Sequence, residues 1–366
     1  MNILIFILIL LVLVVSHEFG HFIVAKKSGI RVDEFSFGFP PKLFGKKIGE
    51  TTYNFNALPL GGYVKIFGEN PDEESLNGPD SKRSFVNKPW YIQAAVLLAG
   101  VTMNFLVAWL LLTVGFLSGL PASVDTVPPG VEVKNQALTV LDVIPKSPAA
   151  EAGIKVGDKL INLESASDQT DTPSKESVQY FIKKHPTDSI VVTYMRGDAT
   201  QTILVTPKII KNSTTQTPVI GISMDVVGTY TLPFFKAVRE GLKLTSKIFV
   251  GTVKGFYTLI HDSLRGRGNI SALTGPVGLV GVVGTAASFG FIYLLSFTAQ
   301  ISISLAVINL VPFPALDGGR LLFLLIEKIK GSRIKPAIAN TANVIGFGLL
   351  MILMLVITYH DIAKLL

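Results

Sequence analysis

The 366-residue chain is 49% hydrophobic and only 16% charged, and it contains no cysteine. With a mean hydropathy of +0.49, this composition is typical of a membrane protein with several spans and a soluble portion. The net charge of +7 is explained by loops that face anionic lipid, so we expect a lipid bilayer as a partner and no nucleic acid. The lack of cysteine excludes disulfide scaffolds and thiolate metal sites.

The first apolar segment, residues 1–25, predicts a membrane-spanning helix. Residues 3–15 are all aliphatic or Phe, and the apolar run resumes at residues 22–25, which is about the length that a span needs. The segment lacks a basic start and a small-residue cleavage site, so we expect it to be retained. Ten Lys and Arg residues follow in residues 26–90. They predict a cytoplasmic loop and an N-terminus outside.

The end of this first helix carries a HExxH motif, formed by His17, Glu18 and His21. Residues four apart lie on one helix face, so the two imidazoles can bind one metal ion while Glu18 lies beside it as a general base. The alternative is a helix end whose polar residues reach lipid headgroups. A catalytic zinc also needs a third protein ligand. The residue six after His21 is Lys27, and Glu34 is a nearby candidate.

The next segments predict a β-element, a second span and a soluble domain. Residues 35–66 are rich in Gly, Pro and β-formers, which indicates either a re-entrant β-structure in the membrane or an ordinary cytoplasmic hairpin. Residues 91–120 are uncharged and long enough to span. Residues 121–228 have the composition of a small globular domain outside the membrane, with a hairpin around residues 196–198.

The rest of the chain predicts two more spans. Residues 229–285 contain an amphipathic helix, which we expect either on the membrane surface or against the soluble domain, followed by an interfacial segment. Residues 286–319 form a third span that ends at Asp317. Residues 320–336 are a basic cytoplasmic loop. Residues 337–366 form a fourth span, and we expect His360 and Asp361 near its end to lie outside the membrane and to be incidental.

Asp317 is the better candidate for the third ligand. Prolines and glycines around it break the helix, and alternating topology brings it to the same cytoplasmic depth as His17 and His21. A loop-capping aspartate is the alternative.

Taken together, these motifs resemble the site-2 protease family of intramembrane zinc metalloproteases, in its bacterial branch with one PDZ domain. The resemblance rests on HExxH, on residues 38–64, on Ala99 and Gly100 through Asn104, and on NxxPxPxLDGG at residues 309–319. It implies Zn²⁺ held by His17, His21 and Asp317, with Glu18 as the general base. It also implies substrate contacts from Asn309, Gly61 and Gly62. The implied fold is an α-helical polytopic membrane protein of about four spans and a re-entrant β-element, with an inserted α+β PDZ domain.

The function that the resemblance implies is a zinc-dependent intramembrane endopeptidase acting in regulated intramembrane proteolysis. Its expected substrates are single-span membrane proteins such as anti-sigma factors or signal-peptide remnants, with peptide C-termini as PDZ ligands. The expected location is the bacterial inner membrane, with the PDZ domain extracytoplasmic. The alternatives are a catalytically inactive PDZ-containing membrane scaffold, a transporter and a zincin of the soluble type that uses Glu34.

Overall fold

The computed structural model describes residues 2–127, 130–170, 173–209, 217–266 and 274–365. The chain divides into two compact units. The first, here called the membrane unit, comprises Met1–Val114, Phe235–Ala287 and Leu294–Leu366; the second, the sheet unit, comprises Gly115–Phe234 and Ser288–Tyr293. Residues 267–273, within the predicted interfacial segment, lie outside the described residues.

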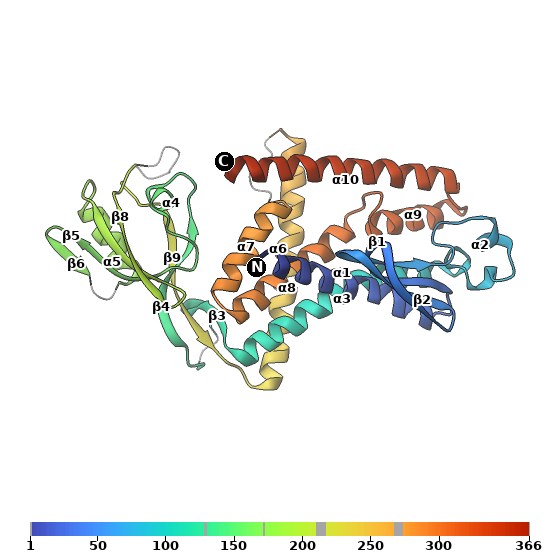
Figure 1. Ribbon diagram of the computed structural model, residues 1–366, viewed down its shortest axis with the longest axis horizontal. Helices are drawn as coiled ribbons and strands as arrows, with labels where there is room; N and C mark the ends of the chain where they lie inside the picture. The colour runs from blue at the N-terminus through green and yellow to red at the C-terminus, as the bar shows by residue number, and fades with distance from the viewer. Residues whose placement is uncertain (1, 128–129, 171–172, 210–216, 267–273, 366) are drawn as a thin grey trace. The chain divides into compact units, whose positions relative to one another are not determined.

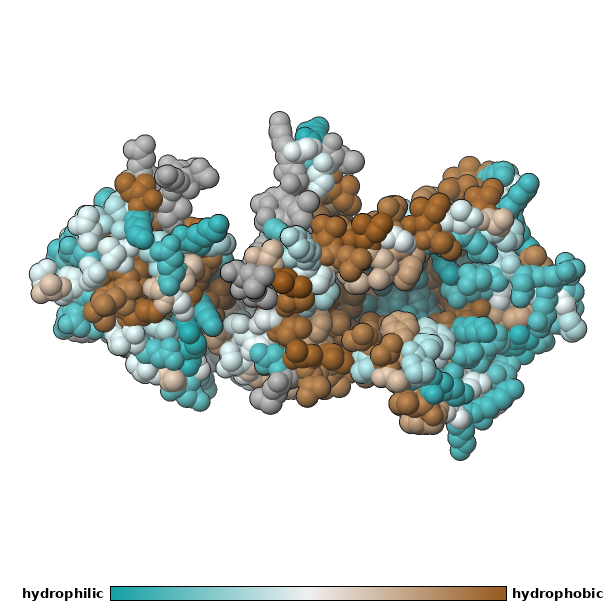
Figure 2. Space-filling view, turned by 45° about the horizontal axis from the view of Figure 1, so that its top comes forward, coloured by the Kyte–Doolittle hydropathy of each residue, from teal (hydrophilic) through white to brown (hydrophobic). Residues whose placement is uncertain are grey.

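Four helices within the described ranges are long and apolar enough to cross a membrane: α1 (Asn2–Lys27), α3 (Trp90–Ser118), α8 (Phe291–Leu310) and α10 (Pro336–Leu365). Their apolar side chains suit hydrocarbon, and their backbone groups bond internally. The unit also contains α2 (Glu73–Asn77), α6 (Phe234–Leu264), α7 (Pro276–Ser288), α9 (Asp317–Lys330) and the 3₁₀ turns Ser81–Arg83 and Phe85–Asn87. In Figure 1, α6 crosses the direction of α10 steeply. Hydrophobic residues gather over the helices in Figure 2, and hydrophilic ones at the end that carries α2.

Two long antiparallel strands, β1 (Val32–Ile48) and β2 (Thr51–Ile66), form the sheet of the membrane unit. Both strands bend, so the middle of β1 pairs with β2 on both of its sides. Phe35, Ser36 and Phe37 pair with Val64, Tyr63 and Gly62 on one side and with Tyr53, Asn54 and Phe55 on the other. Residues 62–64 therefore form an outer edge of this sheet, where outward backbone groups are not paired with another strand and can accept one.

Over its described residues, the sheet unit is a seven-stranded antiparallel sheet with two short helices. Its strands are β3 (Leu120–Ser123), β4 (Lys134–Val143), β5 (Lys159–Ser165), β6 (Asp168–Thr170), β7 (Ile190–Arg196), β8 (Ala199–Val205) and β9 (Ile222–Tyr230). They follow the order β3-β9-β4-β5-β7-β8, with β6 paired to β5. The helices are α4 (Pro148–Ala152) and α5 (Lys175–Lys184), and Val124–Thr126 is a 3₁₀ turn. The predicted hairpin is confirmed, because β7 and β8 pair in register around Gly197.

The expectation that Asp361 is incidental is wrong. Its side chain is buried, and the Gly278 N–H donates a hydrogen bond to its Oδ2 at 2.8 Å. The first N–H groups of a helix lack intrahelical partners, so a carboxylate from another helix can cap them. Asp361 thus joins the end of α10 to the first turn of α7, and hydropathy alone does not reveal such a contact.

Candidate metal centre

The structure brings His17, His21 and Asp317 together. His17 and His21 lie one turn apart on α1 and are both buried. Their Nε2 atoms are 3.1 Å apart. Asp317 Oδ2 lies 3.0 Å from Nε2 of His17 and 3.3 Å from Nε2 of His21. Three potential ligand atoms from two distant parts of the chain therefore point at one spot.

The spacing of these three atoms fits one tetrahedral zinc ion. Zinc bonds of about 2.0–2.1 Å place neighbouring tetrahedral ligands about 3.3 Å apart. The observed separations of 3.0, 3.1 and 3.3 Å agree with this value. Three protein ligands leave one position for water or substrate, as catalytic zinc sites require.

The second nitrogen of the His21 ring is held so that Nε2 is left for a metal. His21 Nδ1 lies 2.8 Å from the backbone carbonyl of Val96 on α3. A carbonyl oxygen only accepts, so Nδ1 must carry the proton and donate it, and Nε2 then keeps its lone pair. This contact fixes both the tautomer and the ring orientation of His21.

Asn104 on α3 holds the His17 ring in a similar way. Its side-chain amide nitrogen lies 3.3 Å from His17 Nδ1, and its Oδ1 is buried with no hydrogen-bond partner. The oxygen and nitrogen of a side-chain amide are told apart by their hydrogen bonds. If the two atoms of Asn104 are exchanged, its Oδ1 accepts a hydrogen bond from the Nδ1–H of His17. That orientation satisfies the orphaned oxygen and leaves Nε2 of His17 available to a metal. The Ser302 hydroxyl on α8 donates a hydrogen bond of 2.8 Å to the backbone carbonyl of Asn104.

Gly100 lets α3 approach the two histidines closely. A Cβ atom at this position would lie 2.4 Å from His21 Nε2 and 2.6 Å from His17 Cε1. Gly20 has the same role on α1, since a Cβ there would meet the Ala99 carbonyl oxygen at 2.4 Å. Small residues of this kind allow close packing between membrane helices.

Asp317 reaches the histidines because the chain turns sharply after α8. The helix ends at Leu310, Pro312 and Pro314 follow, and α9 begins at Asp317. Proline disfavours continuation of α8. Any Cβ at Gly318 would lie 2.4 Å from the Leu310 carbonyl oxygen, so the turn is too tight for a larger residue. The carboxylate also lies in the first turn of α9, where the helix dipole favours negative charge.

Glu18 points toward the sheet of the membrane unit. Its Oε2 accepts a hydrogen bond of 3.0 Å from the backbone N–H of Val64 on β2. Gly61 and Gly62 precede Val64 on the same edge strand and are buried. Gly61 has φ +155°, and a Cβ there would lie 3.3 Å from the Val14 side chain of α1. The edge strand and the first helix are thus in direct contact beside Glu18.

Among the described residues, the two remaining candidates, Asn309 and Glu34, are not hydrogen-bonded to the three ligand candidates. Asn309 is in the last turn of α8, and no hydrogen bond joins it to the three ligand candidates among the described residues. Glu34 lies on β1, where its Oε2 accepts hydrogen bonds from the Asn54 side chain and the Tyr63 hydroxyl, each at 3.0 Å. Its carboxylate is therefore engaged within the sheet.

The sequence predicts close helix packing at the small residues around Gly100, but it assigned no role to Asn104 or to the Val96 carbonyl. Asn104 had a usable signal, since a polar side chain in the middle of an uncharged spanning segment usually bonds within the protein. The Val96 carbonyl had none, because every residue carries that group.

Two histidines one turn apart and an adjacent glutamate on a helix that can span a membrane, with a carboxylate from a distant segment beside them, are typical of a membrane metalloprotease. Residues 5–353 match peptidase family M50. The chain therefore belongs to this family, that of the site-2 proteases.

Similar proteins cover nearly the whole chain. The Clostridium acetobutylicum protein named "Putative zinc metalloprotease" is 34% identical over 362 residues, which is 99% of this chain and 97% of that protein. "Zinc metalloprotease RasP" of Geobacillus kaustophilus is 30% identical, with 98% of this chain and 97% of that protein covered. "Regulator of sigma-W protease RasP" of Bacillus subtilis is 29% identical and covers 98% of each.

Family and relatives together establish the enzyme class. The chain is a zinc metalloprotease with a Zn²⁺ cofactor and a site-2 protease function. With its four candidate spans, it is a multi-pass bacterial membrane protein.

Proposed function

We propose that this enzyme hydrolyses a peptide bond inside the transmembrane segment of single-span membrane proteins, such as anti-sigma factors or signal-peptide remnants. One observation carries the proposal: His17 and His21 lie on α1, a helix that can span a membrane, and Asp317 meets them there. Ionisable groups within a span are costly and are kept for function. A site at that position would act on membrane-embedded chain.

In this proposal His17, His21 and Asp317 hold the zinc, and Glu18 is the general base. Zinc, when bound, polarises a peptide carbonyl and lowers the pKa of water at its open position. Glu18 takes a proton from the attacking water and then delivers it to the leaving amine. Asn104 and the Val96 carbonyl keep the two imidazoles oriented. Asn309, at the end of α8, orients the substrate.

The edge of the small sheet receives the substrate. A transmembrane helix hides its peptide bonds in its own hydrogen bonds and must unwind before hydrolysis. In hydrocarbon, each backbone group that it frees needs a new partner. Pairing with the edge strand at Gly61 and Gly62, next to Glu18, supplies those partners by β-strand addition.

The distribution of charge sets the topology. The loop of residues 26–90 and the segment of residues 328–335 carry many Lys and Arg residues, so they face the cytoplasm and the metal centre lies toward that side. The sheet unit is then extracytoplasmic, and the membrane is the bacterial inner membrane.

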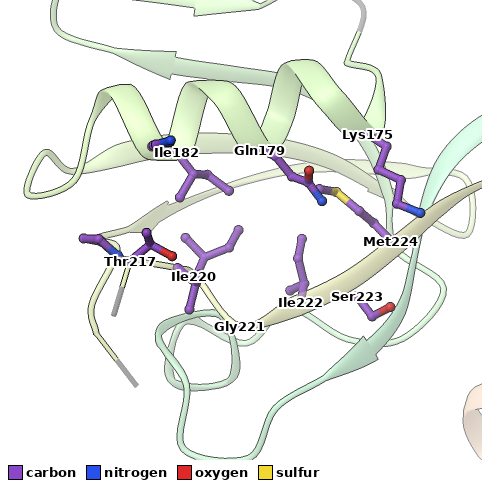
Figure 3. Close-up of a pocket in the computed structure, with 12 residues that line it drawn as sticks. Lys175, Gln179, Ile182, Thr217, Ile220, Gly221, Ile222, Ser223 and Met224 are labelled. Carbon is purple, nitrogen blue, oxygen red and sulfur yellow. The ribbon is translucent and has the colours of Figure 1, made fainter. Parts of the chain in front are cut away.

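The sheet unit acts as a PDZ domain that binds peptide C-termini. A pocket of about 570 Å³ lies between α5 and the start of β9. In Figure 3, Ile182 of α5 and Ile220 and Ile222 of the facing segment point into it. Ile222–Met224 pair with β4 on one side, whereas β3 pairs only with residues 227–230. The start of β9 is thus an edge to which a peptide strand can add.

Lys175 and Lys183, which line the same pocket, supply positive charge for a terminal carboxylate. A hydrophobic peptide with a free C-terminus should bind, and amidation of that C-terminus should weaken binding about tenfold or more, because an ion-paired hydrogen bond is lost. Titration of the two peptides into the purified protein measures this. Equal affinity of the free and amidated peptides would show that the pocket does not recognise a free C-terminus.

The catalytic proposal is tested with a truncated single-span reporter in detergent. Wild type should cut within the span, whereas the Glu18→Gln variant should retain zinc and not cut. Mass spectrometry of the products locates the cleavage, and zinc is quantified in both proteins. If both bind zinc and neither cuts any of several reporters, the inactive scaffold is the better description. If neither wild type nor Glu18→Gln contains zinc, His17, His21 and Asp317 are not the zinc ligands.

A further inference from the structure

The hydrogen bond between Glu18 and Val64 joins the proposed general base to the strand that is proposed to receive substrate. Val64 N lies 3.0 Å from Glu18 Oε2. Among the described residues, the Glu18 side chain makes no other hydrogen bond or ion pair. The carboxylate is therefore held by one backbone donor, at the outer edge of the sheet.

The strand register shows which backbone groups an added strand would use. Val64 faces Phe35 and Gly62 faces Phe37 on the inner neighbour. Val64 directs its N–H toward Glu18 and hence away from that neighbour. In an antiparallel pair, backbone groups alternate in direction from one residue to the next. The outward groups are thus those of Gly62 and Val64, while those of Tyr63 point inward to Ser36.

An added substrate strand and Glu18 consequently need the same donor. A strand that pairs along residues 62–64 must place a carbonyl oxygen on the Val64 N–H, because each outward residue offers one donor and one acceptor. That N–H is already bonded to the Glu18 carboxylate. Both acceptors cannot hold it at full strength.

We propose that the Val64 amide positions Glu18 in the free enzyme, and that a substrate strand displaces Glu18 from this amide as it docks. Val64 is in this sense a positioning residue. Docking then frees the carboxylate beside the metal centre at the moment when a peptide bond is in place. This inference rests on the proposed function and adds a link between substrate binding and the state of the general base.

The test measures binding in variants that cannot cut. The Glu18→Gln variant keeps a carbonyl oxygen that can accept from Val64, whereas Glu18→Met fills similar space and accepts nothing. Both lack the charge of Glu18, and zinc content is checked to be equal. A fluorescent single-span peptide is titrated into each purified full-length protein. We expect Glu18→Met to bind it about twofold to tenfold more tightly, the effect of removing one competing hydrogen bond.

A Val64→Pro substitution in both backgrounds provides the control. Proline has no N–H, so the difference between the two variants should vanish. Equal affinity of Glu18→Gln and Glu18→Met with Val64 intact would overturn the inference. If neither binds the peptide and wild type does not cleave it, the proposed function fails instead.

Hydrogen exchange gives a second readout that does not need the proline variant to fold. The amide of Val64 should exchange at least about tenfold faster in Glu18→Met than in Glu18→Gln, because it has lost its acceptor. Added peptide should restore its protection. Unchanged exchange in Glu18→Met would show that Glu18 does not hold this amide.

Discussion

Two aspartates in the two units show how partners decide what a carboxylate does. Asp158 in the sheet unit is fully buried. Arg196 donates to both of its oxygens at 2.7 Å, and the Lys155 N–H donates to Oδ2 at 2.8 Å. Asp317 in the membrane unit faces two histidine rings, with no Lys or Arg in ion-pair range among the described residues.

The difference separates a structural carboxylate from one that can bind a cation. Asp158 has its negative charge balanced and its lone pairs used by donors from its own chain, as a buried ion must. Histidines in the neutral form that binds a metal cannot balance the charge of Asp317, and their Nε2 atoms add lone pairs aimed at the same point. A divalent cation supplies what is missing there.

When each aspartate is replaced by asparagine, the larger effect on function should come from Asp317→Asn. Asp317→Asn removes the only anionic ligand, so zinc should be lost on purification and cleavage of the reporter abolished. Folding of the membrane unit should change little, because Asp317 has no structural cation partner. Metal analysis and thermal unfolding in detergent measure the two effects. Retained zinc with full cleavage would exclude Asp317 as a ligand.

Asp158→Asn is the matched control in the sheet unit, and its effects should be opposite. It leaves Arg196 without its anion, and breaking such a pair costs about 3 kcal/mol of unfolding free energy, the lower end of the range because the Arg196 side chain is 26% exposed. Zinc content should stay the same. Hydrogen exchange of β5 and β7 in the full-length protein reports the destabilisation. An unchanged sheet unit would show that the pair contributes nothing net.

The sequence allowed the local parts of the site to be predicted, but not the contacts between distant segments. Helical periodicity is enough to place His17, Glu18 and His21, and hydropathy is enough to locate four apolar helices. Val96 and Asn104 bond to the histidines from 75 and 87 residues away, and Val64 bonds to Glu18 from 46 residues away. Such contacts depend on how α3 and the small sheet pack on α1, which no local pattern encodes.

Asp317 lies between these two cases. It is 300 residues from His17, but the break in the helix and the depth in the membrane are both readable from sequence. Asp361 was misjudged because its partner is the Gly278 backbone N–H, which has no signature in sequence. Polar residues of spanning segments thus reveal that they have a partner, but not which one.

Glu50 extends the comparison to a carboxylate that is partly exposed. It joins Lys26 and Arg83, each through an N–O distance of 2.6 Å, and its side chain is 30% exposed. The hydrogen bond from Lys26, followed by that from Arg83, lowers the pKa of Glu50 below its ordinary value of 4.5. Solvent weakens such pairs, so Glu50→Gln should cost less than about 1 kcal/mol of unfolding free energy at neutral pH.

The pH dependence of that cost follows from the direction of the shift. A lowered pKa in the folded state means that the stabilisation is complete above the unfolded value and is lost as pH falls through the folded one. Wild type and Glu50→Gln should therefore differ at pH 7, begin to converge near the ordinary Glu pKa of 4.5, and coincide only below the lowered pKa of the folded state. Thermal unfolding of both proteins in detergent across this range measures the difference. A difference that persists at low pH would mean that Glu50 acts through packing and not through its charge.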